Sequence, residues 1–101
     1  MQLYNTLSAE ERAQLIEQAG EKRLTLSFYA YAKIENPEQF RNDLFIAWNA
    51  LGALGRTYVA HEGINAQMSV PAENFDAFRD TLEVYDFMKG IRLNVAVEQD
   101  D

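Results

Sequence analysis

The sequence contains no cysteine and only one histidine. Without cysteine the chain has no disulfide, no zinc–thiolate site, no persulfide carrier and no thiol nucleophile. No apolar run approaches the ~18–20 residues of a membrane-spanning helix. The N-terminal segment MQLYNTLSAEE has neither the basic nor the apolar region of a secretory signal. These absences predict a cytoplasmic domain without metal or thiol chemistry.

Basic residues are also few. The chain of 101 residues has 9 Lys and Arg against 16 Asp and Glu, a net charge of −7. Its hydrophobic share of 48% is normal for one globular domain of this length. Unaided binding to a phosphate backbone favours the opposite charge.

The apolar pattern predicts a leading helix followed by six further elements. Ser8 and Glu11 form an S-x-x-E capping box, which predicts a helix from there to about Ala19. Asn36 followed by Pro37 is the start signal of a second helix. The other expected elements are strands at 24–34, 56–61, 64–70 and 91–97, and a third helix that begins near Pro71.

The order β-α-β-β-α-β after a leading helix is typical of the ferredoxin-like fold of the α+β class. Right-handed crossovers then place two helices on one face of a four-stranded antiparallel sheet. We expect an N-terminal helical extension at 1–22, the ferredoxin-like domain at 23–98, and the start of a linker at 99–101. The second and fourth strands of this domain are expected at the edges.

Because apolar and polar residues alternate along the predicted strands, only one face of the sheet is apolar and covered by the helices, and the other face is polar and free of helices. Tyr29 and Tyr31 lie on this face, in an arrangement that resembles the stacking platform of RNA-recognition sheets. Burial of the same tyrosines under another domain is the alternative interpretation. The third strand places Asn65, not an aromatic residue, on this face. The candidates for contact with a substrate or a partner domain are Tyr29, Tyr31, Arg56, His61, Glu62, Asn65 and Arg92.

The predicted hairpin tip contains His61, Glu62 and Gly63. One histidine and one carboxylate do not reach the three ligands of a metal centre, so we expect no metal site. A hydrogen-bonded structural role and a contact role both remain open for His61. Gly63 is expected to be the turn residue with a positive φ.

Acylphosphatases share the predicted topology. Their chemistry needs backbone NH groups and an arginine around a phosphate after the first strand. Here residues 32–37 contain no glycine, carry Glu35, and lose a donor at Pro37. No glycine-rich phosphate loop and no Ser-His-Asp order is present either. We therefore predict no catalytic residue in this chain.

Two segments, SFYAY at 27–31 and GRTYVAHEGINAQ at 55–67, carry a family resemblance. They are similar to the N-terminal, acylphosphatase-like domain of the rhodanese-related tRNA uridine hydroxylases. Residues 69–72 and 90–96 resemble the same domain, so the likeness covers roughly 24–97. The AHEGINAQ stretch is its most specific part, and the residues before 24 match no motif.

The resemblance implies an activity that belongs to a longer protein, of which this chain is one part. Members of the family are bacterial cytosolic oxidoreductases in which this domain precedes a rhodanese domain. They use molecular oxygen to convert the wobble uridine of tRNA, position 34, to 5-hydroxyuridine, and their essential cysteine lies in the rhodanese domain. The resemblance thus implies a fragment without a cofactor of its own. Its implied partners are tRNA and its own rhodanese domain, and no membrane.

Two roles for the domain follow from this resemblance. The polar sheet face and the His61 hairpin either hold the anticodon loop of the tRNA or dock on the rhodanese domain. The net charge of −7 favours docking. A stand-alone regulatory module that binds a small ligand is a third possibility, and it requires a pocket.

Overall fold

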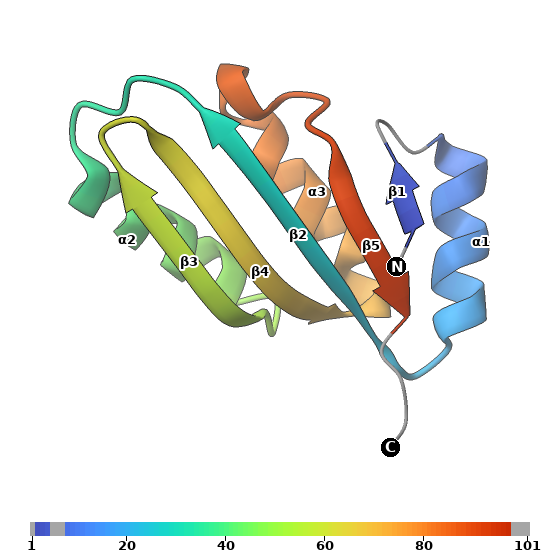
Figure 1. The fold of residues 1–101 in the computed structure, drawn as a ribbon. Helices are drawn as coiled ribbons and strands as arrows, with labels where there is room; N and C mark the ends of the chain where they lie inside the picture. Colours follow the sequence, from blue (N-terminus) through green and yellow to red (C-terminus); the bar gives the residue numbers. More distant parts are fainter. Residues whose placement is uncertain (1, 5–7, 98–101) are drawn as a thin grey trace.

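The computed structural model describes residues 2–4 and 8–97; residues 1, 5–7 and 98–101, which include the expected linker, lie outside the description (Figure 1). A single antiparallel sheet contains five strands in the order β1-β5-β2-β4-β3. The elements are β1 (Gln2–Tyr4), α1 (Ala9–Ala19), β2 (Arg23–Tyr31), α2 (Pro37–Asn49), β3 (Leu54–Ala60), β4 (Gly63–Pro71), a 3-10 turn η1 (Ala72–Asn74), α3 (Phe75–Glu83), a 3-10 turn η2 (Asp86–Met88) and β5 (Leu93–Val97).

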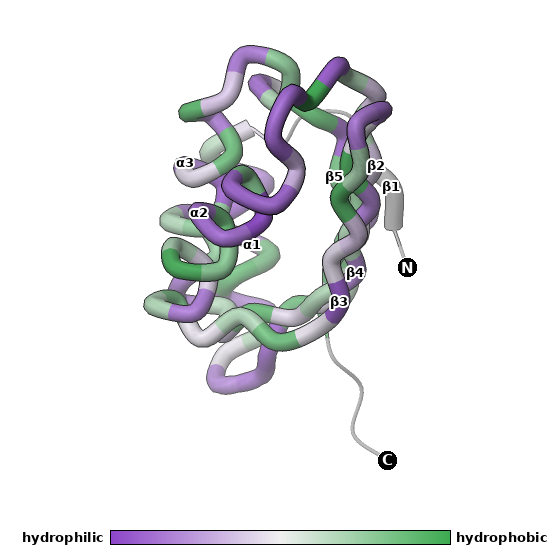
Figure 2. The backbone as a smooth tube through the Cα atoms, turned by 90° about the vertical axis from the view of Figure 1, so that its left-hand side faces the viewer, coloured by the Kyte–Doolittle hydropathy of each residue, from purple (hydrophilic) through white to green (hydrophobic). Residues whose placement is uncertain are grey.

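The predicted ferredoxin-like arrangement is confirmed. Strands β2 to β5 form the four-stranded antiparallel unit, and helices α1, α2 and α3 all cover the same face (Figure 2). The short strand β1 adds a fifth strand by pairing with β5, so the expectation that the fourth strand of the domain is an edge is wrong. The other expected edge, β3, is confirmed. No helix among residues 2–4 and 8–97 covers the opposite face of the sheet.

The leading helix is joined to the rest of the domain. Ser8 and Glu11 form the predicted capping box, with the Glu11 amide donating to Ser8 Oγ over 3.1 Å. Arg12 pairs with Asp76 at the start of α3 over 3.0 Å. Leu15 is buried in the same core as the sheet and the other helices.

Helix α2 begins where the sequence predicts. The Asn36 side chain accepts a hydrogen bond from the Gln39 amide over 3.1 Å, and Pro37 occupies the first turn. Trp48 on this helix is 4% exposed and donates its indole NH to Thr81 Oγ1 over 2.9 Å. Its ring also packs edge-on against Phe28 of β2. The tryptophan therefore connects α2, α3 and the sheet.

Two of the larger differences from the predicted element boundaries have a clear physical cause. β2 ends at Tyr31 and not at residue 34, because its partner strand β4 begins at Gly63, directly opposite Tyr31. β4 itself continues to Pro71, so the third helix begins at Phe75 and not near Pro71. In both places the limit is set by strand pairing, which a local sequence pattern does not contain.

Candidate functional site

A row of three side chains crosses the helix-free face of the sheet. Asn65 on β4 stands directly opposite Tyr29 on β2 and directly opposite Tyr58 on β3. Tyr31 lies two residues further along β2, with its ring centroid 5.7 Å from that of Tyr29. The exposed fractions of Tyr29, Tyr31 and Tyr58 are 65%, 82% and 68%. The face therefore presents a cluster of solvent-exposed aromatic rings.

Tyr58 is the residue that sequence reasoning missed. The sequence pattern indicates no aromatic partner for Tyr29 on the central third strand of the predicted domain, where Asn65 stands, whereas the structure supplies Tyr58 from the edge strand β3. Tyr58 is two residues from the candidate Arg56 on the same predicted strand, so the sequence does indicate that both side chains lie on one face. Only the register between β3 and β4, however, places Tyr58 beside Asn65.

The tyrosines border a shallow hollow of about 370 Å³. Asn65, Gly63 and Glu62 also line it. The exposed Asn65 carboxamide makes no hydrogen bond with any residue that the structure describes. A hollow with aromatic sides and a free amide suits a flat, polar ring.

A second row lies beside the first. It runs from Arg56 through Gln67 and Ser27 to Asn94, each residue directly opposite the next across neighbouring strands. Arg56 is exposed and has no ion pair within the described part of the chain. Asn94 donates a hydrogen bond to Ser27 Oγ over 3.3 Å. Arg92, also exposed, stands just before β5.

The fold separates the charges of the chain. None of the five strands contains an aspartate or a glutamate. The carboxylates of residues 8–97 lie in helices, caps and loops, and the two charged residues on strands are Arg23 and Arg56. Arg23 is engaged with Ser69 and with the Gly52 carbonyl. The strands of the open face are thus uncharged or cationic although the molecule is acidic, with the exposed carboxylate of Glu62 beside them at the hairpin tip.

The hairpin tip is fixed by hydrogen bonds to the segment after β2. His61 Nδ1 is 3.0 Å from the Ile34 carbonyl and donates to it, so its Nε2 is unprotonated when the ring is neutral. The His61 and Glu62 carbonyls accept from the amides of Ile34 and Ala32 over 2.9 and 3.0 Å. Gly63 has the predicted positive φ, 153°. No group of three potential metal ligands occurs among residues 2–4 and 8–97.

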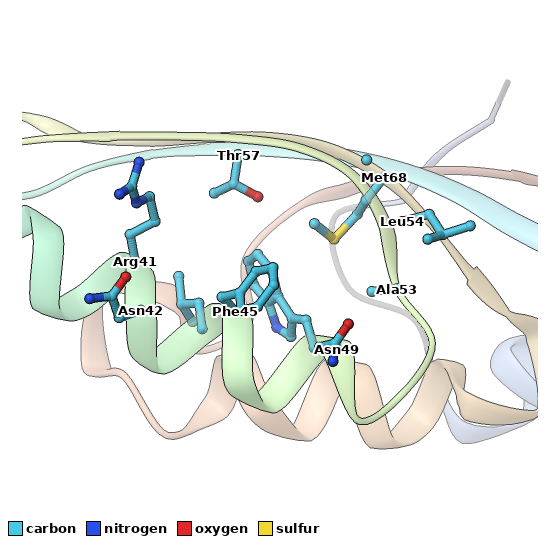
Figure 3. A pocket seen from close by; sticks show the side chains of 11 residues that line it. Arg41, Asn42, Phe45, Asn49, Ala53, Leu54, Thr57 and Met68 are labelled. Atoms are coloured by element: carbon cyan, nitrogen blue, oxygen red, sulfur yellow. The ribbon is translucent and has the colours of Figure 1, made fainter.

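A second hollow lies between α2 and the edge strand β3 (Figure 3). It measures about 430 Å³, and Phe45 points into it from the helix while Thr57 and Leu54 approach it from the strand. Arg41 is the only charged residue in its described lining. This is the pocket that the small-ligand hypothesis requires, but nothing in it indicates a particular ligand.

The family model of the UPF0176 acylphosphatase-like domain matches residues 23–101. This chain belongs to that family. The UPF0176 domain is 42% identical to a protein of Leptospira interrogans, 43% to one of Salmonella typhimurium and 47% to one of Cronobacter sakazakii. Each relative is named tRNA uridine(34) hydroxylase. The alignments cover 97% of this chain but only 27–28% of each relative, so the chain spans little more than a quarter of their length.

In the UPF0176 domain, three backbone amides of the region that follows β2 are already engaged in hydrogen bonds. In the segment after β2, the amides of Ala32 and Ile34 are already donated to hairpin carbonyls. The Gln39 amide is likewise taken by the Asn36 side chain. These donors are therefore not available to an anion. Among the residues that the structure covers, no helix is long and apolar enough to cross a membrane.

Proposed function

We propose that this UPF0176 domain is the N-terminal part of a cytoplasmic enzyme that hydroxylates the wobble uridine of tRNA to 5-hydroxyuridine. Catalysis belongs to a rhodanese domain outside this chain, with molecular oxygen as co-substrate. The role that we assign to the domain is to hold the tRNA through its open sheet face. The names of the relatives support the activity.

The separation of charge carries this assignment. A net charge of −7 argued for docking on the rhodanese domain, on the assumption that the charge is spread evenly. The strands carry no carboxylate, however, and Arg56 is free on their open face. A phosphate backbone that approaches the strands of this face away from Glu62 therefore meets a cation and uncharged side chains before it meets the acidic helices.

The exposed side chains on the same face also favour RNA over a protein partner. Around Arg56 they are tyrosines and the carboxamides of Asn65 and Gln67. Leu54 is the only exposed large aliphatic residue on the described strands. Single-stranded RNA is bound mainly by stacking and by hydrogen bonds to base edges.

An amide chemical-shift titration tests the proposal. The 101-residue chain is mixed with an anticodon stem-loop that contains uridine 34, at low and at moderate salt. We expect shifts on Tyr29, Tyr31, Tyr58, Asn65 and Arg56 that weaken as the salt concentration rises.

Two charge reversals provide the matched comparison. Arg56→Glu changes a free cation on the open face, and Arg41→Glu changes a free cation on α2. The first should weaken binding several-fold, and the second should leave it unchanged. Absence of any shift at low salt would reject the proposal and assign the open face to docking on the rhodanese domain.

A further inference from the structure

The tyrosine hollow has a shape and chemistry that the tRNA assignment alone does not explain. We propose that Tyr29, Tyr31, Tyr58 and Asn65 form a pocket for one unstacked nucleobase of a single-stranded RNA segment. This inference rests on the function proposed above and assigns it to a specific place on the sheet.

The geometry supports a single base. Tyr29 and Tyr58 stand on either side of Asn65, because both are its direct cross-strand partners. Directly opposite residues have Cβ atoms roughly 5 Å apart, so the two rings flank the carboxamide. Tyr31 closes one side, with its ring at 69° to that of Tyr29. A base can therefore lie against one ring and meet the edge of another.

The chemistry of Asn65 supports a base and not merely an apolar ring. Its carboxamide offers both a donor and an acceptor, and no described residue uses either. The Watson–Crick edge of each base presents the same pair of functions, so the amide can bind it but does not by itself select uracil. An aliphatic ligand would leave these groups unpaired when it covers them, which is unfavourable.

Two of the charged residues near the pocket, Glu62 and Arg56, favour one direction of the RNA. Glu62 stands at the hairpin end of the hollow, and Arg56 stands one row away at the other end. A phosphate is repelled by the first and attracted by the second. The base therefore enters between the tyrosines, with its phosphate directed toward Arg56.

A uridine hexanucleotide is the probe, because it is single-stranded and offers bases without a folded loop. The full chain is titrated with it at low salt, and a blunt RNA duplex of the same length serves as the comparison. We expect the hexanucleotide to shift the amides around Tyr58 and Asn65. The duplex, whose bases are stacked and paired, should bind more weakly and leave Asn65 unshifted.

Three variants separate stacking from other effects. Tyr58→Leu removes the ring and should lower the affinity about tenfold, whereas Tyr58→Phe keeps the ring and should stay within about twofold. Leu54→Ala removes a similarly exposed side chain from the same strand, outside the tyrosine hollow, and should have no effect. Tyr58 is exposed, so all three proteins should fold, as their unchanged spectra away from the face will show.

The outcomes keep the two proposals apart. If the stem-loop binds the open face but Tyr58→Leu binds as well as Tyr58→Phe, the base pocket is wrong and the tRNA assignment stands. Preference for the duplex would also overturn the pocket. If neither RNA shifts any amide, both proposals fail together, and the exposed tyrosines belong to a protein interface.

Discussion

Gly63 occupies a place in the sheet that admits no side chain. Its φ is 153°, and a Cβ atom built on it would lie 2.1 Å from the Ala30 carbonyl oxygen. We predict that Gly63→Ala lowers the free energy of unfolding by about 3–4 kcal/mol, because the strained backbone and the clash between strands add together. Urea denaturation of the purified chain measures this change.

Gly20→Ala is the matched control for this substitution. Gly20 also has a positive φ, 59°, but nothing lies within 4 Å of the position its Cβ would take. Its replacement should therefore cost only the backbone strain, about 1–3 kcal/mol. Equal losses in the two variants would show that β2 does not approach Gly63 as closely as described.

Single residues were predictable where a local pattern determines them. The positive φ of Gly63 and the capping residues Ser8 and Asn36 are confirmed, but the turn itself lies at His61 and Glu62, and Gly63 is the first residue of β4. Tyr58 was missed because its role depends on the neighbour that strand pairing provides. The functional roles proposed for the exposed residues remain predictions.

An aromatic cluster connects α2 to the segment around η2, and it gives the domain a specific response to alkali. The Phe40 and Tyr85 ring centroids are 5.0 Å apart. Burial raises the pKa of Tyr85 above its usual value of 10.0, and the Asp43 carboxylate raises it further. The folded state thus favours the neutral phenol. The stability from this preference is complete below the unfolded pKa and is lost as the pH rises through the folded pKa.

We predict that the urea midpoint of the wild type falls more steeply above about pH 10 than that of Tyr85→Phe. The phenylalanine variant keeps the ring packing but has no proton to lose. Denaturation series at several alkaline pH values measure both midpoints. Parallel curves would mean that Tyr85 ionises equally easily in the folded and unfolded chains.

At the scale of elements, the sequence predicts long segments with a clear apolar period. It does not predict short strands, or strand ends, that depend on pairing with a neighbouring strand. The alternation in β2 and the start of α2 are each contained in local sequence, and both are confirmed. Strand β1 has only three residues, too few to show a period. β1 forms a strand because it pairs with the free edge of β5. β2 ends at Tyr31 because the antiparallel partner strand β4 begins at Gly63, directly opposite.

At the scale of the molecule, the distribution of charge over the surface says more about RNA binding than the net charge does. The sequence places 16 acidic residues along the chain, but the fold gathers those it describes on the helical side and in loops. Most of the exposed strand positions carry tyrosine, amide side chains and arginine, in keeping with the low β-propensity of Asp and Glu. A composition-based argument against RNA therefore does not hold for the open face.

The salt dependence of RNA binding follows from the same distribution. Arg23 is occupied by Ser69 and Gly52, which leaves Arg56 as the free cation on the described strands, with exposed Arg92 just before β5. Neutralising one or two phosphates of a single strand gives a slope of log K against log salt of about −0.7 to −1.4. We predict a slope in this range for the uridine hexanucleotide, because stacking supplies the remaining affinity. A slope of about −3 or steeper would require four or more phosphate contacts, and would show that the RNA extends beyond the open face.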